Sequence, residues 1–574
     1  MRCRRPRRLG LEAATLSIAS LAVYVFVAYP ALKAAWFGVS QFQDDSYYYL
    51  VTAKNFLRHG FFTFDGANAT NGFQPLWMGA IVVLYKGLGI DSPLNLQIFA
   101  VSALEKLVLA GAVATSIGFY ISYRRRDSPW AAGFLAACVL LLCPFYAIFD
   151  QGMETTLAVL LLLLVIHAFI SDRSLLLGAW LALLFLTRLD TAIFVAMPLL
   201  LWTLLKSSRA ERSHWLGIAL FSLTFFAYVG INIATTGHAV PISGALKSSF
   251  PAIRWQGAFF VEPITLAEMF GWAVLVRGIN MVTCAMLVLA GLGFMLVARP
   301  AKPERDKLLM LVAIVALLLA NLLMFQKWDK SIDPRYLALP MLVATIFAAT
   351  TFAWVIERVR LRVEHLAASR TGAKTRVRAA SFAWRTTDVV LATLPYALVG
   401  ILLLLEGVAH FSRFAAYSER KHDFVRQFYG DVSNALPPNA VIAGTDVGAL
   451  AFWTQRRVVN LDGVINNLEY QEYLRRGGLR DYLRREGVTF LATALWDREQ
   501  NYTGRPIEPM YRQLLDPRAE RGTDYDLHPY YVYSYLYNVY SDSIALTPGD
   551  EFYRRFVGKD GVADAAYVIY RLPG

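Results

Sequence analysis

The chain has 574 residues, of which 56% are hydrophobic and only 17% are charged, and its formal net charge is +13. Soluble proteins average about a quarter charged residues, whereas here the mean hydropathy is +0.42 and the apolar residues gather in long runs typical of membrane spans. The basic residues lie in short segments between these runs, so we interpret them as topology signals and exclude nucleic acid as a partner.

The N-terminus has the basic sequence MRCRRPRR, and an apolar run at 9–36 follows it. The apolar part of a signal peptide is only about 7–15 residues long. We therefore predict a first transmembrane helix with a cytoplasmic N-terminus, and cleavage near 31–35 is the alternative.

Further apolar runs bring the prediction to about eleven spans, each near the length that a bilayer needs. The spans are predicted at 9–36, 97–122, 130–149, 155–171, 174–189, 191–205, 215–235, 275–298, 307–326, 336–356 and 386–409. The segments rich in Lys and Arg are separated by pairs of spans, so we place all of them on the cytoplasmic side. These segments are 2–8, 124–126, 172–173, 206–212, 299–307 and 358–385.

Residues 37–95 then form one long outer loop, in which the apolar run at 75–89 suits an interfacial segment better than a span. The C-terminal segment lies on the same outer side and alternates β-like runs with amphipathic helix-like runs. The β-like runs are AVIAG, RRVVNLDG, VTFLATAL and AAYVIYRL, and the helix-like runs are NNLEYQEYLRR and LRDYLRREG. The predicted fold class is thus a polytopic α-helical membrane protein (1–409) with a C-terminal extracytoplasmic α/β domain (410–574).

Two adjacent carboxylates, Asp44 and Asp45, follow the outer end of the first predicted span. Ionisable groups at the membrane edge are functional candidates by default, and a carboxylate there can act as a general base for an acceptor hydroxyl. The alternative is that both only cap the helix-like segment that follows them. Glu154 either heads the next helix or is a second acid facing Asp44 across a cavity. We expect Arg188 and Asp190, between two apolar runs, to neutralise each other.

The outer loop contains the sequence FDGANATNGFQPLW at 64–77. Asn71, Gln74 and Trp77 in this loop are residue types that bind sugars by hydrogen bonding and stacking. The alternative is an ordered loop that lies on the membrane.

Four cations on the predicted outer side depart from the usual cytoplasmic preference of Lys and Arg, namely Lys247, Lys327, Lys330 and Arg335. A phosphate group would explain them, and the guanidinium fork of Arg335 can hold a phosphate with two bonds. The alternative is that Arg335 pairs with Asp329 or Asp333.

These elements, in this order, resemble the GT-C superfamily of membrane glycosyltransferases, which includes the protein O-mannosyltransferases and the bacterial aminoarabinose and arabinofuranosyl transferases. The resemblance covers about 9–410 and rests on Asp44-Asp45, GFQPLW, Glu154 and the late element RYLALP. The segment VIAGTDVGALAFWTQRRVVNLDG is similar to outer domains of bacterial members. No motif of the WWDYG type is present, so we expect transfer of a single sugar rather than of a whole oligosaccharide.

The resemblance implies that Asp44 is the catalytic base and that the donor substrate is a polyprenyl-phosphate sugar. We expect inversion at the anomeric carbon, no metal, and an acceptor hydroxyl on a glycan, lipid or protein at a bacterial inner membrane. The expected sites are catalytic Asp44, Asp45 and Glu154; phosphate-binding Arg335, Lys247 and Lys330; and sugar- or acceptor-binding Asn71, Gln74, Trp77 and Tyr336.

Two other classes stay open. A transporter or lipid flippase is the main alternative, although no internal repeat is visible and the ionisable residues gather at the outer edge rather than at mid-membrane. A phosphoethanolamine-type transferase needs a metal cluster, and His59, His238, His422 and His528 show no ligand spacing. Of the four cysteines, Cys3, Cys138, Cys143 and Cys284, none lies in the C-terminal segment, so no disulfide is predicted there.

Overall fold

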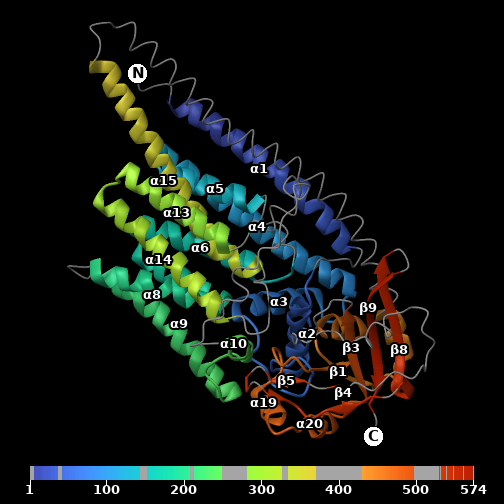
Figure 1. Ribbon diagram of the computed structural model, residues 1–574. Coiled ribbons are helices and arrows are strands. Elements are labelled where there is room, and N and C mark those ends of the chain that lie inside the picture. The colour runs from blue at the N-terminus through green and yellow to red at the C-terminus, as the bar shows by residue number, and fades with distance from the viewer. Residues whose placement is uncertain are drawn as a thin grey trace.

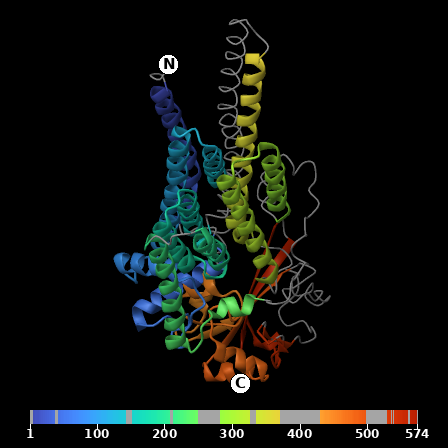
Figure 2. The same cartoon turned by 90° about the vertical axis from the view of Figure 1, so that its left-hand side faces the viewer.

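The structure is a computed structural model that describes residues 5–36, 42–142, 151–206, 212–248, 281–325, 334–369, 429–496 and 529–572, the last range without 531, 535, 538, 547, 560 and 561. Long helices lie side by side, and the C-terminal strands gather at one end of them (Figure 1). In the view turned by 90°, the N-terminus lies at the far end of the helices from the C-terminus (Figure 2).

Within the described residues, five helices are long and apolar enough to cross a membrane by length and composition. They are α4 (Leu94–Arg125), α9 (Arg212–Thr236), α13 (Met281–Ala298), α14 (Lys302–Phe325) and α15 (Pro334–Ser369). Five apolar helices are shorter, namely α3 (Pro75–Leu88), α5 (Trp130–Leu142), α6 (Thr155–Ile170), α7 (Ser174–Thr187) and α8 (Leu189–Lys206). The chain begins with α1 (Arg5–Trp36), which is 32 residues long.

The helices share one apolar core, in which Leu162, Leu181 and Leu342 are fully buried. Leu and Ala dominate these segments and are strong helix formers, so propensity and burial agree. Other large apolar side chains on the same helices are exposed, for example Leu223 at 70% and Leu296 at 74%. An exposed apolar surface of this kind is what a bundle surrounded by lipid presents.

A helix lies in each predicted span that falls within the described residues, and the span predicted at 386–409 lies outside them. The helix α3 is 14 residues long, shorter than the roughly 20 residues that a span needs, but α5 at 13 residues and α7 at 14 lie in predicted spans, so length alone does not distinguish the predicted interfacial segment.

Basic connectors predicted to be cytoplasmic meet at one end of the helices. Lys307 Nζ lies 2.8 Å from Asp172 Oδ2, and Arg358 donates to the backbone carbonyl of Ala298 at 2.6 Å. Lys307 lies near the start of α14, and Arg358 lies in the second half of α15. The start of α15 therefore lies at the opposite end of the helices. The connectors therefore lie away from the end where the strands gather.

The C-terminal region contains a five-stranded sheet in the order β2-β1-β3-β9-β8. Strand β1 pairs in parallel with β2 and β3, and β9 pairs antiparallel with β3 and β8. The strands are β1 (Val441–Gly444), β2 (Arg457–Asn460), β3 (Phe490–Trp496), β8 (Glu551–Lys559) and β9 (Val562–Arg571). Four shorter strands are β4 (Pro529–Tyr530), β5 (Tyr533–Ser534), β6 (Val539–Tyr540) and β7 (Ile544–Ala545). The helices are α17 (Gly430–Ala435), α18 (Gly448–Thr454), α19 (Leu468–Arg475) and α20 (Leu479–Arg485).

The four strands and two helices predicted in this region are confirmed. Strand β8 was not predicted, because the charges in EFYRRFVGK interrupt the apolar pattern of a buried strand. Since β1 and β2 are parallel, their carboxyl ends share one edge of the sheet. This edge lies against α2 (Asp44–His59), since Asp44 accepts from the N–H of Gly448 after β1 and Tyr48 donates to Asp462 after β2.

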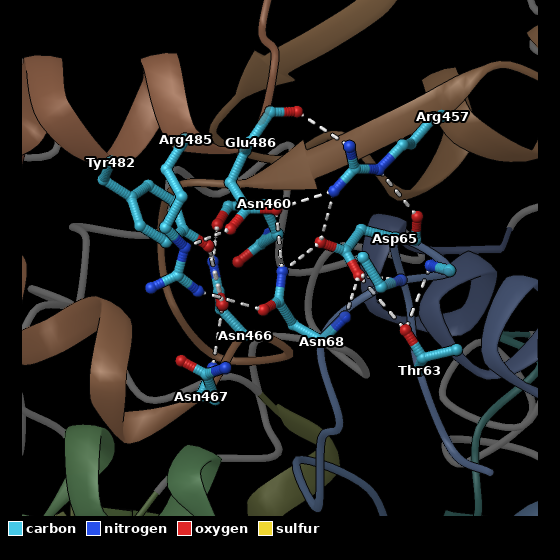
Figure 3. Close-up of polar contacts among 12 residues, drawn as sticks. Thr63, Asp65, Asn68, Arg457, Asn460, Asn466, Asn467, Tyr482, Arg485 and Glu486 are labelled. Atoms are coloured by element: carbon cyan, nitrogen blue, oxygen red, sulfur yellow. Dashed lines mark hydrogen bonds and ion pairs between the residues drawn. The ribbon is translucent and has the colours of Figure 1, made fainter.

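A cluster of charged and amide side chains joins the predicted outer loop to the C-terminal region (Figure 3). Arg457, at the start of β2, lies 2.6 Å from Glu486 Oε2 and 3.5 Å from Asp65 Oδ2. Asn68 Nδ2 donates to Asp65 at 2.7 Å and to Glu486 at 3.0 Å. Both carboxylates are buried; Arg457 compensates both of them, and Arg485, whose Nε lies 3.1 Å from Glu486 Oε1, also compensates Glu486.

Candidate active site

Asp44 and Asp45 begin α2 at the end of the helices that faces the C-terminal strands (Figure 1). Gln43 is the N-cap residue of α2 and makes no side-chain capping bond. The partners of the two acids are 404 and 290 residues further along the chain, on α18 and α15. Capping of their own helix, the alternative role, therefore does not account for these contacts.

Asp45 holds two of the cations that were predicted to bind phosphate. Its Oδ2 lies 2.8 Å from Arg335 Nη2 and 3.8 Å from Lys247 Nζ. Gln43 Oε1 accepts a further bond from Arg335 Nη1 at 2.8 Å. Burial would raise the pKa of Asp45, but the charges of Lys247 and Arg335 outweigh it and lower that pKa to about 2. Asp45 thus stays ionised at physiological pH.

Lys247 is the last residue of α10 (Ile242–Lys247), and Asn71 fixes the start of this helix. The Asn71 side chain accepts from the backbone N–H of Ile242 at 3.0 Å and donates to Thr236 Oγ1 at 3.3 Å. Asn71 is buried with these bonds made. The structure thus places Asn71 as support for the helix that carries Lys247, whereas the sequence predicted a direct sugar contact.

The ring of Tyr336 connects two charged groups. The guanidinium carbon of Arg335 lies 5.1 Å from the ring centroid and that of Arg188 lies 4.9 Å from it, both within cation–π range. The Tyr336 hydroxyl lies 3.4 Å from Lys247 Nζ. Tyr336 is only half-buried, so it keeps an accessible part beside the cations.

The second charged group is a buried trio. Arg188 lies 3.2 Å from Glu154 Oε1 and 3.2 Å from Asp190 Oδ2, which confirms the expected pair and adds Glu154 to it. Glu154 also accepts from the Tyr49 hydroxyl at 3.1 Å. It precedes α6 as its N-cap residue but makes no side-chain capping bond. Its carboxylate is therefore bound by Arg188 and Tyr49. The sequence instead predicted a second acid that faces Asp44 across a cavity.

Gln74 and Trp77 flank the start of α3. Gln74 Oε1 accepts from the backbone N–H of Leu189 at 3.0 Å, and the Gln74 side chain is half-buried. Trp77 is fully buried, and its indole N–H donates to the carbonyl of Gly152 at 3.1 Å. A ring without exposed surface has no face for a sugar, so the predicted stacking role of Trp77 is corrected to a packing role.

Asp44 reaches the C-terminal region. Its Oδ2 accepts from the backbone N–H of Gly448 at 2.8 Å, and its Oδ1 accepts from that of Ala449 at 2.8 Å. Burial raises the pKa of Asp44 to about 6, although these two hydrogen bonds lower it. A carboxylate has about four lone-pair positions, so Asp44 can accept a substrate proton in addition to these two bonds. A pKa near the working pH suits a general base.

Gln43, Gly448 and Ala449 belong to this site and were not predicted from the sequence. The available signal was TDVGALAF, a turn between a predicted strand and an apolar segment, which alone does not indicate its partner. Lys330, predicted to bind phosphate, lies outside the described residues. Among the residues that the structure describes, no group of three or more His, Cys, Asp or Glu side chains is arranged to hold a metal ion.

Fold and site define a multi-pass helical protein with membrane-type helices, in which Asp44, Asp45, Lys247 and Arg335 lie at the end beside a C-terminal sheet. No protein-family model and no curated protein sequence matches the chain. It is similar to the structure of ArnT from Cupriavidus metallidurans bound to undecaprenyl phosphate, with a TM-score of 0.48, 12% identity and coverage of 96% of this chain and 97% of that chain. For ArnT in the apo state, the TM-score is 0.45, with 13% identity over 96% of this chain and 98% of that chain. For the oligosaccharyltransferase of Archaeoglobus fulgidus tethered with an acceptor peptide, the TM-score is 0.42, with 12% identity over 92% of this chain and 75% of that chain.

Proposed function

We propose that this protein is a membrane glycosyltransferase that moves a single sugar from a polyprenyl-phosphate donor to an acceptor hydroxyl. One observation carries the proposal: Asp44, with a raised pKa, adjoins Asp45, which holds the cations Arg335 and Lys247. A base for the acceptor and cations for a leaving phosphate are what this transfer requires. The apolar surface of the neighbouring helices suits a prenyl tail.

Arg335 and Lys247 bind the donor phosphate in this proposal. The guanidinium of Arg335 offers a fork of donors that matches two phosphate oxygens, and Lys247 adds a compact charge. Asp45 and Gln43 hold Arg335 in place before the lipid arrives. Lys330 remains a proposed third cation.

Asp44 acts as the general base. It takes the proton of the acceptor hydroxyl while that oxygen forms a bond to the anomeric carbon of the sugar. The bond between the anomeric carbon and the phosphate oxygen breaks, and its electron pair stays on the phosphate, which leaves as polyprenyl phosphate. A single displacement from the opposite face inverts the anomeric configuration, and nearby carboxylates favour the positive charge that develops on the ring.

The remaining predicted residues divide into two roles. Tyr336 and Gln74 are half-buried and are the proposed sugar or acceptor contacts. Asn71 and Glu154 are buried and act through other residues. Asn71 supports the helix that carries Lys247, and Glu154 orients Arg188 against the ring of Tyr336.

We place the reaction on the extracytoplasmic face of a bacterial inner membrane, with the N-terminus in the cytoplasm. The support is the separation of charges: basic connectors meet around Lys307 and Arg358, away from the end that holds Asp44 and Asp45. A lipid-phosphate sugar is already activated, so no nucleotide is needed on that face.

The test is a transfer assay with the purified full-length protein in lipid nanodiscs and a panel of polyprenyl-phosphate sugars, with glycan, lipid and peptide acceptors. We expect one donor to release polyprenyl phosphate, with loss of release in Asp44→Asn. The matched control is Asp91→Asn, because Asp91 is an exposed acid whose salt bridge to Arg58 lies on the surface. Movement of labelled lipid across vesicles without release from any donor would instead identify a flippase and overturn the proposal.

A further inference from the structure

Asp44 is fixed by the backbone of a region that begins about 400 residues later. The N–H groups of Gly448 and Ala449 each bond one of its carboxylate oxygens, at 2.8 Å in both cases. Two bonds to two different oxygens define the plane of the carboxylate as well as its position. A base must hold its lone pair within hydrogen-bond reach of the proton that it takes, so this plane matters for the rate.

The start of α18 and the start of α2 approach each other so closely that position 448 requires glycine. A Cβ atom at this position would lie 2.4 Å from the backbone carbonyl oxygen of Asp44 and 3.0 Å from its Oδ2. The nearest atom belongs to the backbone, so a side-chain rotation cannot relieve the overlap. Any side chain at 448 must therefore push α18 away from Asp44.

The helix α18 is also attached to α2 at its other end. The ring of Phe452 is buried and lies 5.3 Å from that of Tyr47, and the Lys54 ammonium donates to Gln455 Oε1 just after α18. The contact at Asp44 is thus one end of a helix-to-helix interface and not an isolated surface contact.

The turn before α18 is fixed by the sheet. Asp446 has a φ of 50°, which non-glycine residues rarely adopt, and its backbone N–H donates to Asp462 at 3.3 Å. Asp462 follows β2 and also accepts from the Tyr48 hydroxyl at 2.9 Å. The strands β1 and β2 therefore determine where the N–H groups of Gly448 and Ala449 lie.

We propose that Gly448 and Ala449 are positioning residues for the base, so that the C-terminal region forms one wall of the active site and completes it only when α18 lies against α2. The inference rests on the proposed function, because it concerns the residue that takes the acceptor proton. It assigns the C-terminal region a direct part in catalysis, through its backbone, in addition to any binding of the acceptor.

The test compares Gly448→Ala with Gly430→Ala in the full-length protein. Gly430 lies in the same region, and a Cβ added there meets no atom within 4 Å. We expect Gly448→Ala to lower kcat about 100-fold, the effect of a misplacement of about 1 Å, with the KM for the lipid donor nearly unchanged. The acid limb of the pH profile should move to higher pH, since a carboxylate that loses backbone hydrogen bonds binds its proton more tightly. Gly430→Ala should match the wild type in kcat and in the position of the acid limb.

A second readout does not depend on activity. Carbodiimides modify protonated carboxyl groups, so mass spectrometry of labelled protein across a pH series reports the protonation of Asp44. The labelling midpoint should rise in Gly448→Ala by roughly one unit. It should rise less in Gln455→Gly, which keeps the left-handed backbone at φ 54° and removes the side-chain hydrogen bonds with Lys54 and with the carbonyl of Phe452.

The outcomes separate the two proposals. A shifted labelling midpoint in a protein without transfer activity would support the contact and refute the glycosyltransferase function. Transfer that depends on Asp44, with no shift of midpoint or rate in Gly448→Ala, would keep the function and overturn the positioning role. If Gly448→Ala does not fold, an unshifted midpoint in Gln455→Gly overturns the role on its own.

Discussion

Asp45 Oδ2 and Arg335 Nη2 lie 2.8 Å apart, although 290 residues separate them along the chain. The acid stands at the start of α2 and the arginine near the start of α15. The side chains are 28% and 9% exposed, so water screens the pair only partly. The two cations proposed for the donor phosphate are therefore already partly balanced by one anion of the protein, and the lipid must compete with it.

This competition predicts that Asp45→Asn binds polyprenyl phosphate more tightly. Removal of one negative charge near Arg335 and Lys247 should strengthen binding by roughly five- to tenfold, since a charge at such distances near a protein surface contributes about 1 kcal/mol or more. Titration of a polyprenyl phosphate into the purified variant measures this affinity, with Asp91→Asn as control. Weaker binding than in the wild type would show that Asp45 assists the phosphate instead of competing with it.

Transfer activity should depend on the shape of the Arg335 side chain as well as on its charge. We expect Arg335→Gln to lower kcat/KM for the donor by 100-fold or more, and Arg335→Lys to restore only part, because an ammonium cannot reproduce two parallel bonds to one phosphate. Initial rates over a donor series measure both variants. Full activity in Arg335→Gln would remove Arg335 from the phosphate site.

The acid limb of the pH profile should reflect Asp44. Its pKa is raised to about 6, so a base at this position is protonated, and inactive, as the pH falls through about 6. The pKa of Asp45 is near 2, and this residue stays ionised throughout that window. We expect kcat/KM to fall tenfold per pH unit below about 6, and a limb centred near 4 would point to a different base.

The acids and cations of this site were predicted from the sequence because charges are rare in a chain with such long apolar runs. Asp44, Asp45 and Arg335 stood near the outer end of a predicted span, and Lys247 stood in a predicted outer loop. Periodicity likewise predicted the strands of the C-terminal sheet that consist of apolar, β-branched residues, and missed β8, where arginines interrupt the pattern.

Pairings between distant segments could not be predicted in this way. Whether Arg335 bonds Asp45 or a nearer aspartate depends on how α15 and α2 pack, which no local pattern contains. The hydrogen bonds of Trp77 and Asn71 to buried backbone groups could not be predicted either. The indole and amide groups that bind sugars also form hydrogen bonds with buried backbone groups, and the sequence does not show which of the two they do. Gly448 carries no side chain, and its role follows only from the approach of another backbone.

Glu154 offers a test between a catalytic and a supporting role. Glu154→Gln keeps a hydrogen-bonding group for Arg188 and Tyr49, so we expect it to retain transfer activity within about tenfold of the wild type. Glu154→Ala leaves Arg188 with Asp190 alone and should destabilise the fold by about 3 kcal/mol, as loss of one member of a buried ion cluster does. Thermal unfolding in detergent and the transfer assay measure the two effects. An inactive but normally stable Glu154→Gln would make Glu154 a catalytic acid.

The last prediction concerns the attachment of the C-terminal region at Arg457. Arg457→Ala removes the cation beside the buried carboxylate of Asp65 and leaves Glu486 with Arg485, whose Nε lies 3.1 Å from Glu486 Oε1. Arg457 is 32% exposed, so water offsets part of the loss, and we expect destabilisation of about 1–3 kcal/mol. Limited proteolysis of the nanodisc-bound protein should then cleave the C-terminal region several times faster.

Arg484→Ala is the matched control, because Arg484 is 66% exposed and its contact with Asp481, at 4.0 Å, lies on the surface. Its cleavage rate should equal that of the wild type. Since the same region supplies the N–H groups that hold Asp44, Arg457→Ala should also lower the transfer rate without a change in donor affinity. Equal proteolysis of both variants would mean that the cluster around Arg457 does not hold the two parts of the chain together.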